Sequence, residues 1–103
     1  VEDVRRLLEA GAEVNVVKSD GETPLHVATR HHQSDTRVAE VLLSHGADVH
    51  AKAVNGATPL IQAADIGAVD VARVLLARGA DVNAQDKKLA TAMHVAVVKG
   101  DVE

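Results

Sequence analysis

Two short motifs alternate along the whole chain with a nearly constant period. The first motif reads LLEAGAEVN at 7–15, LLSHGADVH at 42–50 and LLARGADVN at 75–83. Its glycines are 35 and 33 residues apart. The second motif lies between the copies of the first and reads GETPLHVA, GATPLIQA and LATAMHVA, starting at residues 21, 56 and 89. A period of this length is typical of stacked supersecondary units, each of which packs mainly on its neighbours.

Each period contains the signals for two short helices and a loop. Thr23 and Thr58 each precede a proline, which is the order expected of a helix N-cap followed by proline at the first helical position. A second helix follows, because the apolar residues in 38–42 and 71–75 recur at helical spacing. A glycine comes just after each second helix, where a left-handed C-cap favours it: Gly11, Gly46 and Gly79. A polar loop with turn residues then closes the period.

The composition agrees with a repeat and excludes several classes of protein. Of the 103 residues, 47% are apolar and 25% charged, as in globular proteins, while Phe, Tyr, Trp and Cys are absent. Closely stacked helices can be built from Ala, Val and Leu, whereas a single thick core normally uses aromatic rings. The net charge of −4, without a basic cluster or aromatic stacking groups, argues against nucleic-acid binding. No apolar run approaches the roughly 20 residues that span a membrane.

The segments TPLHVA and TPLIQA and the endings of the GADVN type resemble the motifs of ankyrin repeats. This resemblance covers the whole chain and implies an all-α fold, an ankyrin-repeat solenoid of stacked antiparallel helix pairs with projecting hairpin-like loops. We expect six helices within a single ankyrin-repeat domain, residues 1–103. Its parts are a partial repeat (1–20), a full repeat with a two-residue insertion (21–55), a second full repeat (56–88) and a second partial repeat (89–103).

Three departures from the repeat pattern carry structural expectations. The full repeat 21–55 is two residues longer than the next, with the excess near 31–35, so the turn between its helices should be larger. Ile61 stands where the first copy of the motif has a histidine. In the last copy Leu89 and Ala92 replace glycine and proline, which should weaken both the turn and the helix start.

The histidines have structural interpretations. In ankyrin repeats the histidine of the TPLH motif hydrogen-bonds the threonine three residues before it, which implies the pairs His26–Thr23 and His94–Thr91. The other four histidines lack neighbouring ligands at the close, regular spacing of a metal site: His31, His32, His45 and His50. We therefore expect no metal ion and no cofactor.

Acidic residues at one phase of the repeat do not indicate an enzyme. Glu13, Asp48 and Asp81 occupy equivalent loop positions, which favours carboxylates that accept hydrogen bonds from nearby backbone N–H groups. The sequence shows neither a nucleophile–base pair nor a phosphate-binding glycine loop. We therefore expect no catalytic site and no enzyme activity.

The resemblance implies that the chain binds another protein. Ankyrin repeats hold their partners with the loop tips and the exposed side of the first helix of each pair, which together line a concave groove. Carried onto this sequence position by position, the candidate partner-binding residues are Val17, Ser19, Asp20, Glu22, Arg30, His31, Lys52, Val54, Asn55, Ala57, Asp65, Ile66, Gln85, Lys87, Lys88, Ala90, Val98 and Lys99. We expect Val54, Ile66 and Val98 to be exposed apolar contacts. The groove changes from acidic to basic along its length, which orients an approaching partner.

Two other functions stay open. The repeats could form a structural spacer within a longer array, or a regulatory segment of an enzyme. The chain begins at Val1, inside a second helix, so we expect a fragment of a longer solenoid. Neither end has the polar outer face of a terminal repeat, which predicts weak head-to-tail association. We expect no nucleic-acid or membrane partner, and an intracellular, cytoplasmic protein because cysteine is absent.

Overall fold

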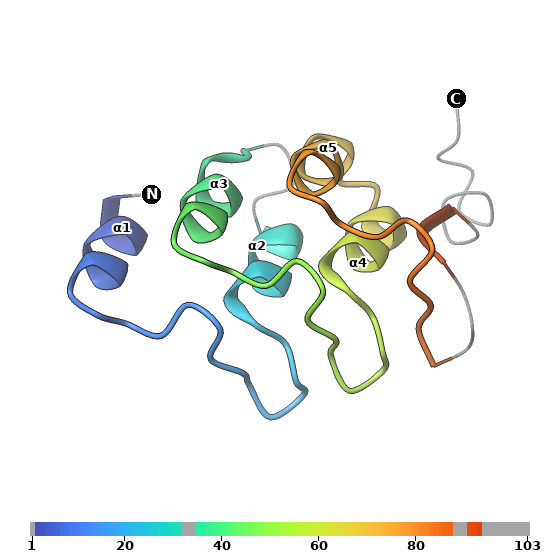
Figure 1. The fold of residues 1–103 in the computed structure, drawn as a ribbon, viewed down its shortest axis with the longest axis horizontal. Helices are drawn as coiled ribbons and strands as arrows, with labels where there is room; N and C mark the ends of the chain where they lie inside the picture. The colour runs from blue at the N-terminus through green and yellow to red at the C-terminus, as the bar shows by residue number, and fades with distance from the viewer. Residues whose placement is uncertain (1, 32–34, 88–90, 94–103) are drawn as a thin grey trace.

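The described part of the chain forms five helices and no strand (Figure 1). The computed structural model describes residues 2–31, 35–87 and 91–93. The helices are α1 (Glu2–Glu9), α2 (Pro24–His31), α3 (Arg37–Ser44), α4 (Pro59–Ile66) and α5 (Val69–Ala77). The all-α class predicted from the sequence is confirmed. The sixth helix, expected after Thr91, falls largely outside the described residues.

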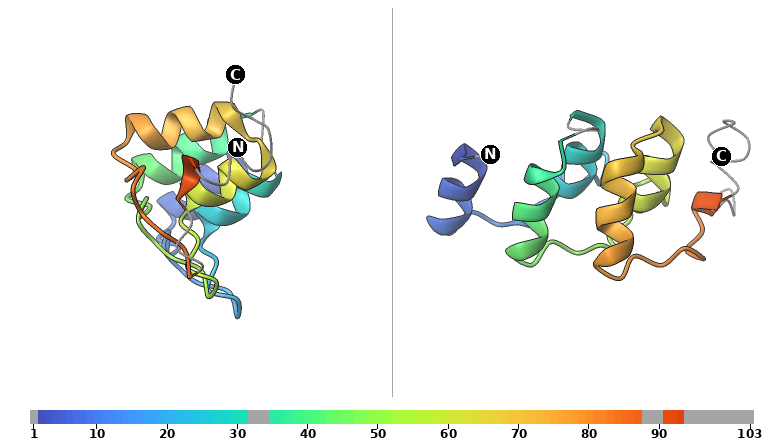
Figure 2. Two further views of the ribbon diagram at one scale, coloured as in Figure 1. Left: turned by 90° about the vertical axis from the view of Figure 1, so that its right-hand side faces the viewer. Right: turned by 90° about the horizontal axis from the view of Figure 1, so that it is seen from above.

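The helices are arranged in two parallel rows. α2 and α4 form an inner row, while α1, α3 and α5 form an outer row, and the loops project to one side (Figures 1 and 2). α2 packs against α3 and α4, α4 packs against α5, and α3 also contacts α1 and α5. The described stack is elongated, with principal extents of 41 × 27 × 21 Å. This is the predicted solenoid of stacked antiparallel helix pairs.

The helix ends follow the predicted capping residues. At the start of α4, the Thr58 side chain accepts a hydrogen bond from the Ile61 N–H group at 3.2 Å, and Pro59 occupies the first turn. Gly46 and Gly79 follow α3 and α5 with φ angles of 92° and 90°, in the left-handed region that favours glycine. The C-cap assignments are therefore confirmed.

Small and branched apolar residues fill the core between the rows. Leu25, Val71 and Leu75 are fully buried. Ala28 and Ala63 are also buried, which lets the backbones of neighbouring helices approach closely. A stack of short helices thus obtains a continuous core without any aromatic ring.

The connection between α2 and α3 is longer than its counterpart in the next repeat. α2 ends at His31 and α3 begins at Arg37, whereas only Gly67 and Ala68 separate α4 from α5. Gly67 reverses the chain in the second case with a φ angle of 75°. The first of these two connections includes residues 32–34, which lie outside the described ranges, so the two-residue insertion stays a prediction.

Candidate protein-binding surface

The tips of consecutive loops are joined by backbone hydrogen bonds. Three loops project from the stack: residues 10–23, 45–58 and 78–87. The Val54 N–H group donates to the Asp20 carbonyl at 2.9 Å, and the Lys87 N–H group donates to the Asn55 carbonyl at 3.1 Å. Because each tip is bonded to the next, the loops present one continuous surface rather than three independent segments.

Two candidate residues at the tips also hold the local turn. A side-chain oxygen of Asp20 accepts from the Glu22 N–H group at 3.0 Å, and that of Asn55 accepts from the Ala57 N–H group at 2.9 Å. The bond from the Glu22 backbone lowers the pKa of Asp20 below its ordinary value of 3.8. Asp20 is therefore a fixed negative charge at the first tip.

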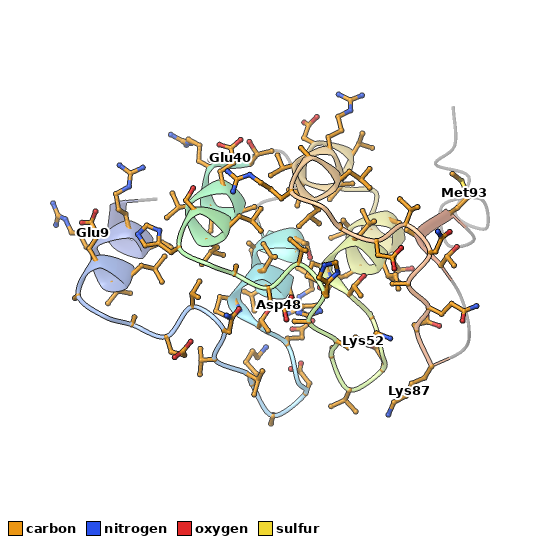
Figure 3. All side chains as sticks on the ribbon, in the orientation of Figure 1. Glu9, Glu40, Asp48, Lys52, Lys87 and Met93 are labelled. Atoms are coloured by element: carbon orange, nitrogen blue, oxygen red, sulfur yellow. The ribbon has the colours of Figure 1, made fainter. Side chains whose placement is uncertain are left out.

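Most of the predicted partner-binding residues are exposed. The exposed members are Val17, Ser19, Asp20, His31, Lys52, Val54, Asn55, Asp65, Gln85 and Lys87. Val17 and Val54 are 61% and 59% exposed, respectively, which is high for valine. Figure 3 shows Lys52 and Lys87 on neighbouring loops, and the Lys52 ammonium group donates to the Gln85 carbonyl at 3.3 Å.

The expectation that Ile66 is exposed is wrong. Ile66 is half-buried and packs against the core, because α5 follows α4 after only two residues and covers the end of α4. Glu22 and Ala57 are also not on the open surface, since they are only 6% and 8% exposed. Both residues lie where a loop enters the inner row of helices. Four further candidates fall outside the described residues: Lys88, Ala90, Val98 and Lys99.

A buried polar network surrounds Glu22. Its Oε2 atom accepts a hydrogen bond from the Arg30 guanidinium group and another from Gln62 Nε2 at 2.8 Å. The Lys18 ammonium group lies 3.6 Å from Oε1. Burial alone raises the pKa of Glu22, but the hydrogen bonds from Gln62 and Arg30 outweigh it, so the pKa is lowered from its usual range. The Glu22 carboxylate is thus ionised and links α2 to α4.

Gln62 was not identified from the sequence as a site residue. It belongs to α4, but the corresponding position of α2 is Val27. A polar residue at a position that is apolar in the other repeat was the available signal. It could not be interpreted from the sequence because the partner, Glu22, is 40 residues away.

His26 is fully buried and has the predicted structural role. Its Nδ1 atom lies 3.0 Å from the Thr23 hydroxyl oxygen, and its Nε2 atom lies 2.8 Å from the Ala57 carbonyl oxygen. Because a carbonyl only accepts, Nε2 carries the proton and Nδ1 accepts from Thr23. The pair implied by the resemblance is therefore confirmed, and His26 also joins one repeat to the next. The second pair, His94–Thr91, includes a residue outside those described.

A shallow groove of about 450 Å³ runs over the first two loop tips and reaches the third. Its lining includes the Asp20, Val54 and Asn55 side chains and, at the third loop, Lys87. The groove therefore has an acidic end at the first loop and a basic end at the third, with exposed valine between them. This arrangement offers complementary contacts to an extended polypeptide rather than a pocket for a small molecule.

The loop carboxylates have backbone partners. The side chains of Asp48 and Asp81 each accept from the N–H group two residues later at 2.8 Å, which confirms their predicted loop role. Within the described ranges, no group of three or more His, Asp or Glu residues is placed to hold a metal ion. Among the helices of the same ranges, none has both the length and the apolar character needed to cross a membrane.

Comparison with known proteins agrees with the geometry. The family model for ankyrin repeats, in three copies, matches residues 1–86. The chain is 47% identical over 70 residues to the 2-5A-dependent ribonuclease of Homo sapiens, a match that covers 67% of this chain and 9% of that protein. It is 43% identical over 68 residues to the ARF GTPase-activating protein GIT1 of Homo sapiens, covering 65% of this chain and 9% of that protein. A protein of Rickettsia felis named as an ankyrin repeat protein is 39% identical over 66 residues, covering 58% of this chain and 29% of that protein.

The chain thus spans less than a third of the length of each of these relatives. The similarity to the ribonuclease and to the GTPase-activating protein concerns only a small part of either protein. It therefore does not carry their activities to this chain. The matched repeats, the capped helix pairs and the projecting loops lead to one conclusion: the chain belongs to the ankyrin-repeat family.

Proposed function

We propose that this chain is a protein–protein interaction module that binds its partner with the loop tips and the concave face formed by the inner helices. Ankyrin repeats generally mediate protein–protein interactions. The observation that carries the proposal is the row of bonded loop tips with exposed Val17 and Val54 side chains. A surface that is already ordered loses little conformational entropy when a partner binds to it.

The polar residues of this face support the same function. Charged residues lie at both ends of the shallow groove that runs over the loop tips, Asp20 at one end and Lys87 at the other. Opposite charges at the rim orient a partner and increase its rate of association. Exposed valine between them supplies apolar area for the centre of an interface.

A pair of matched substitutions tests the proposal. A partner is first captured with the wild-type chain and identified by mass spectrometry, and its affinity is then measured for two variants. Val54→Asp places a charge at the loop tip, while Val69→Asp places the same charge on the outer row, where Val69 is 51% exposed. We expect Val54→Asp to weaken binding at least about tenfold and Val69→Asp to leave it unchanged. Equal loss in both variants, or loss only in Val69→Asp, would move the interface away from the loop tips.

A second candidate is self-association of the chain, which rests on an apolar cleft beside α1. This cleft has a volume of about 360 Å³, and its apolar lining includes Val4, Val16, Val27 and Leu42. We propose that a second copy occupies it weakly at high concentration, in a head-to-tail arrangement. Sedimentation should show concentration-dependent association that Val16→Asp reduces and Val82→Asp does not. Identical behaviour of the two variants would exclude the cleft as the contact.

The remaining parts of the proposal concern catalysis and location. Ankyrin repeats are typically non-catalytic, and we propose that this segment carries out no chemistry of its own. The lack of cysteine supports a reducing, intracellular environment. We propose neither a spacer nor an enzyme-regulating role, because no observation on the described residues favours either one.

A further inference from the structure

The tips of the first two loops are built from the same pair of residue types, an acid or amide followed by glycine. Asp20 and Asn55 each accept a hydrogen bond from the N–H group two residues later, at 3.0 and 2.9 Å. Gly21 and Gly56 follow them with φ angles of 81° and 82°, where glycine is favoured. Of the three asparagines in the sequence, only Asn55 precedes a glycine. The second loop therefore carries, at its tip, a dipeptide with a chemistry of its own.

An asparagine followed by glycine loses its side-chain amide without the help of an enzyme. The backbone nitrogen of Gly56 attacks Cγ of Asn55, the new C–N bond closes a five-membered succinimide, and the bond from Cγ to Nδ2 breaks. Ammonia leaves and takes the proton that the Gly56 N–H group gives up. Water then opens the succinimide at either carbonyl and yields aspartate or isoaspartate, so water is the only reagent consumed. Glycine favours the attack because no β-carbon hinders its nitrogen.

Hydrogen bonds of the folded tip oppose this attack. The Gly56 N–H group donates to the Ala53 carbonyl at 2.8 Å, which holds the proton that must leave. The Asn55 side chain is held by the Ala57 N–H group, and the Asn55 carbonyl accepts from the Lys87 N–H group at 3.1 Å. Ring closure turns both the side chain and the backbone of Asn55, so it breaks these bonds. The reaction therefore requires a local opening in which the second and third loops separate.

The other acid and amide residues of the loops are poorer reactants for the same ring closure. The bond from the Glu22 backbone lowers the pKa of Asp20, so its side chain is ionised at neutral pH. A carboxylate is a much weaker electrophile than an amide. Asn15 and Asn83 precede valine and alanine, whose β-carbons hinder the attacking nitrogen. Asp20, Asn15 and Asn83 therefore serve as internal controls.

We propose that Asn55 is a site of spontaneous deamidation and that the contact between the second and third loops sets its rate. Asn55 is exposed, so water reaches the succinimide. Either product adds a negative charge to the shallow groove over the loop tips, whose lining includes Lys87. Isoaspartate also lengthens the backbone by one atom, which displaces the carbonyl that accepts from Lys87. The effect of the products on a partner rests on the proposed function, whereas the reaction itself does not.

The reaction is measured on the purified chain at neutral pH, both folded and in guanidinium chloride. Mass spectrometry of its peptides detects aspartate and isoaspartate. We expect the denatured chain to form both products at Asn55 well before isoaspartate forms at Asn15, Asp20 or Asn83. The folded chain should react at least about tenfold more slowly, because the tip must open first. This factor should match the hydrogen-exchange protection of the Gly56 amide to within about threefold, because both processes need the same opening.

Two substitutions at Lys87 separate the backbone bond from the charge. Lys87→Pro removes the N–H donor to Asn55 and should speed deamidation of the folded chain at least about threefold. Lys87→Ala removes the charge but keeps the donor, and it should leave the rate unchanged. Equal rates in the folded and denatured wild type, no faster reaction at Asn55 than at Asn15 and Asn83, or equal effects of the two variants would overturn the inference.

The comparison of deamidation with hydrogen exchange uses the wild-type chain alone, so it decides the question even if Lys87→Pro does not fold. No partner is needed for any of these measurements. Failure of the deamidation experiment therefore leaves the proposed function standing, and failure to capture a partner leaves this inference standing.

Discussion

At the scale of single residues, glycine occupies two physically different positions in this chain. Gly46 has a φ angle of 92°, but a β-carbon added there would meet no atom within 4 Å. Gly56 has a φ angle of 82°, and a β-carbon there would lie 2.6 Å from the Lys87 backbone nitrogen. The first position requires glycine for its backbone conformation alone. The second requires it also because the third loop passes directly beside it.

This difference predicts unequal costs for the same substitution. Gly46→Ala should lower the free energy of unfolding by about 1 kcal/mol, because an L residue is strained at positive φ. Gly56→Ala should lower it by at least roughly 2 kcal/mol, because the loops must also move apart. Denaturant titration measures both values. Equal costs, or a smaller cost at Gly56, would contradict the observed contact between the loops.

The lowered pKa of Glu22 predicts how stability depends on pH. A carboxyl group whose pKa is depressed in the folded state stabilises the fold above its unfolded-state pKa, and this contribution is lost as the pH falls through the folded-state value. The difference in unfolding free energy between wild type and Glu22→Gln should therefore be largest near neutral pH and shrink below the ordinary value of 4.5. Glu9→Gln, on exposed α1, serves as the control. A difference for Glu22→Gln that does not vary with pH would contradict the ionised network.

At the scale of helices and loops, a threonine precedes both α3 and α4, but the two helices begin in different ways. Thr58 caps α4 by accepting a hydrogen bond from the Ile61 N–H group at 3.2 Å. Thr36 precedes α3 with helical backbone angles, and its side chain makes no capping bond among the described residues. The same residue type therefore stabilises one helix start directly and the other only weakly.

Alanine substitutions separate these two threonines. Thr58→Ala should lower the free energy of unfolding by about 1 kcal/mol, which is the typical value of a lost N-cap. Thr36→Ala should change it by only a few tenths of a kcal/mol, because no cap is lost. Thermal or denaturant unfolding of the two variants checks the difference. If Thr36→Ala lowers the free energy of unfolding more than Thr58→Ala does, the assignment of Thr58 as the cap of α4 is contradicted.

The elements themselves were predictable from the sequence, whereas the burial of several site residues was not. The caps at Thr58 and Gly46 are local signals that recur once per repeat, so each copy supports the others. The burial of Glu22 depends on Gln62 of the next repeat, and the partial burial of Ile66 depends on how closely α5 follows α4. Such contacts are set by tertiary packing, and no short-range pattern encodes them. The loops were predicted from their turn residues, and the exposed positions at their tips from the resemblance to ankyrin repeats.

At the scale of the whole molecule, each repeat is held mainly by its neighbours. Inner helix packs on inner helix, outer on outer, and backbone bonds join the loop tips from one repeat to the next. Side chains differ between the repeats on both rows, as Glu22 against Ala57 shows on the inner side and Glu40 against Arg73 on the outer row. The buried apolar positions of the outer helices, such as Val38 and Val71, stay apolar.

The central claim is that the partner lies on the loop tips and concave face rather than on the outer row of helices. Cross-saturation NMR on the labelled chain in complex with the captured partner tests this most directly, because it reports which amide groups lie next to the bound protein. We predict the largest intensity losses at Ser19, Val54 and Asn55, with little change at Glu40 and Arg73 on the outer row. The largest losses at Glu40 and Arg73, with the loop tips unaffected, would contradict the account.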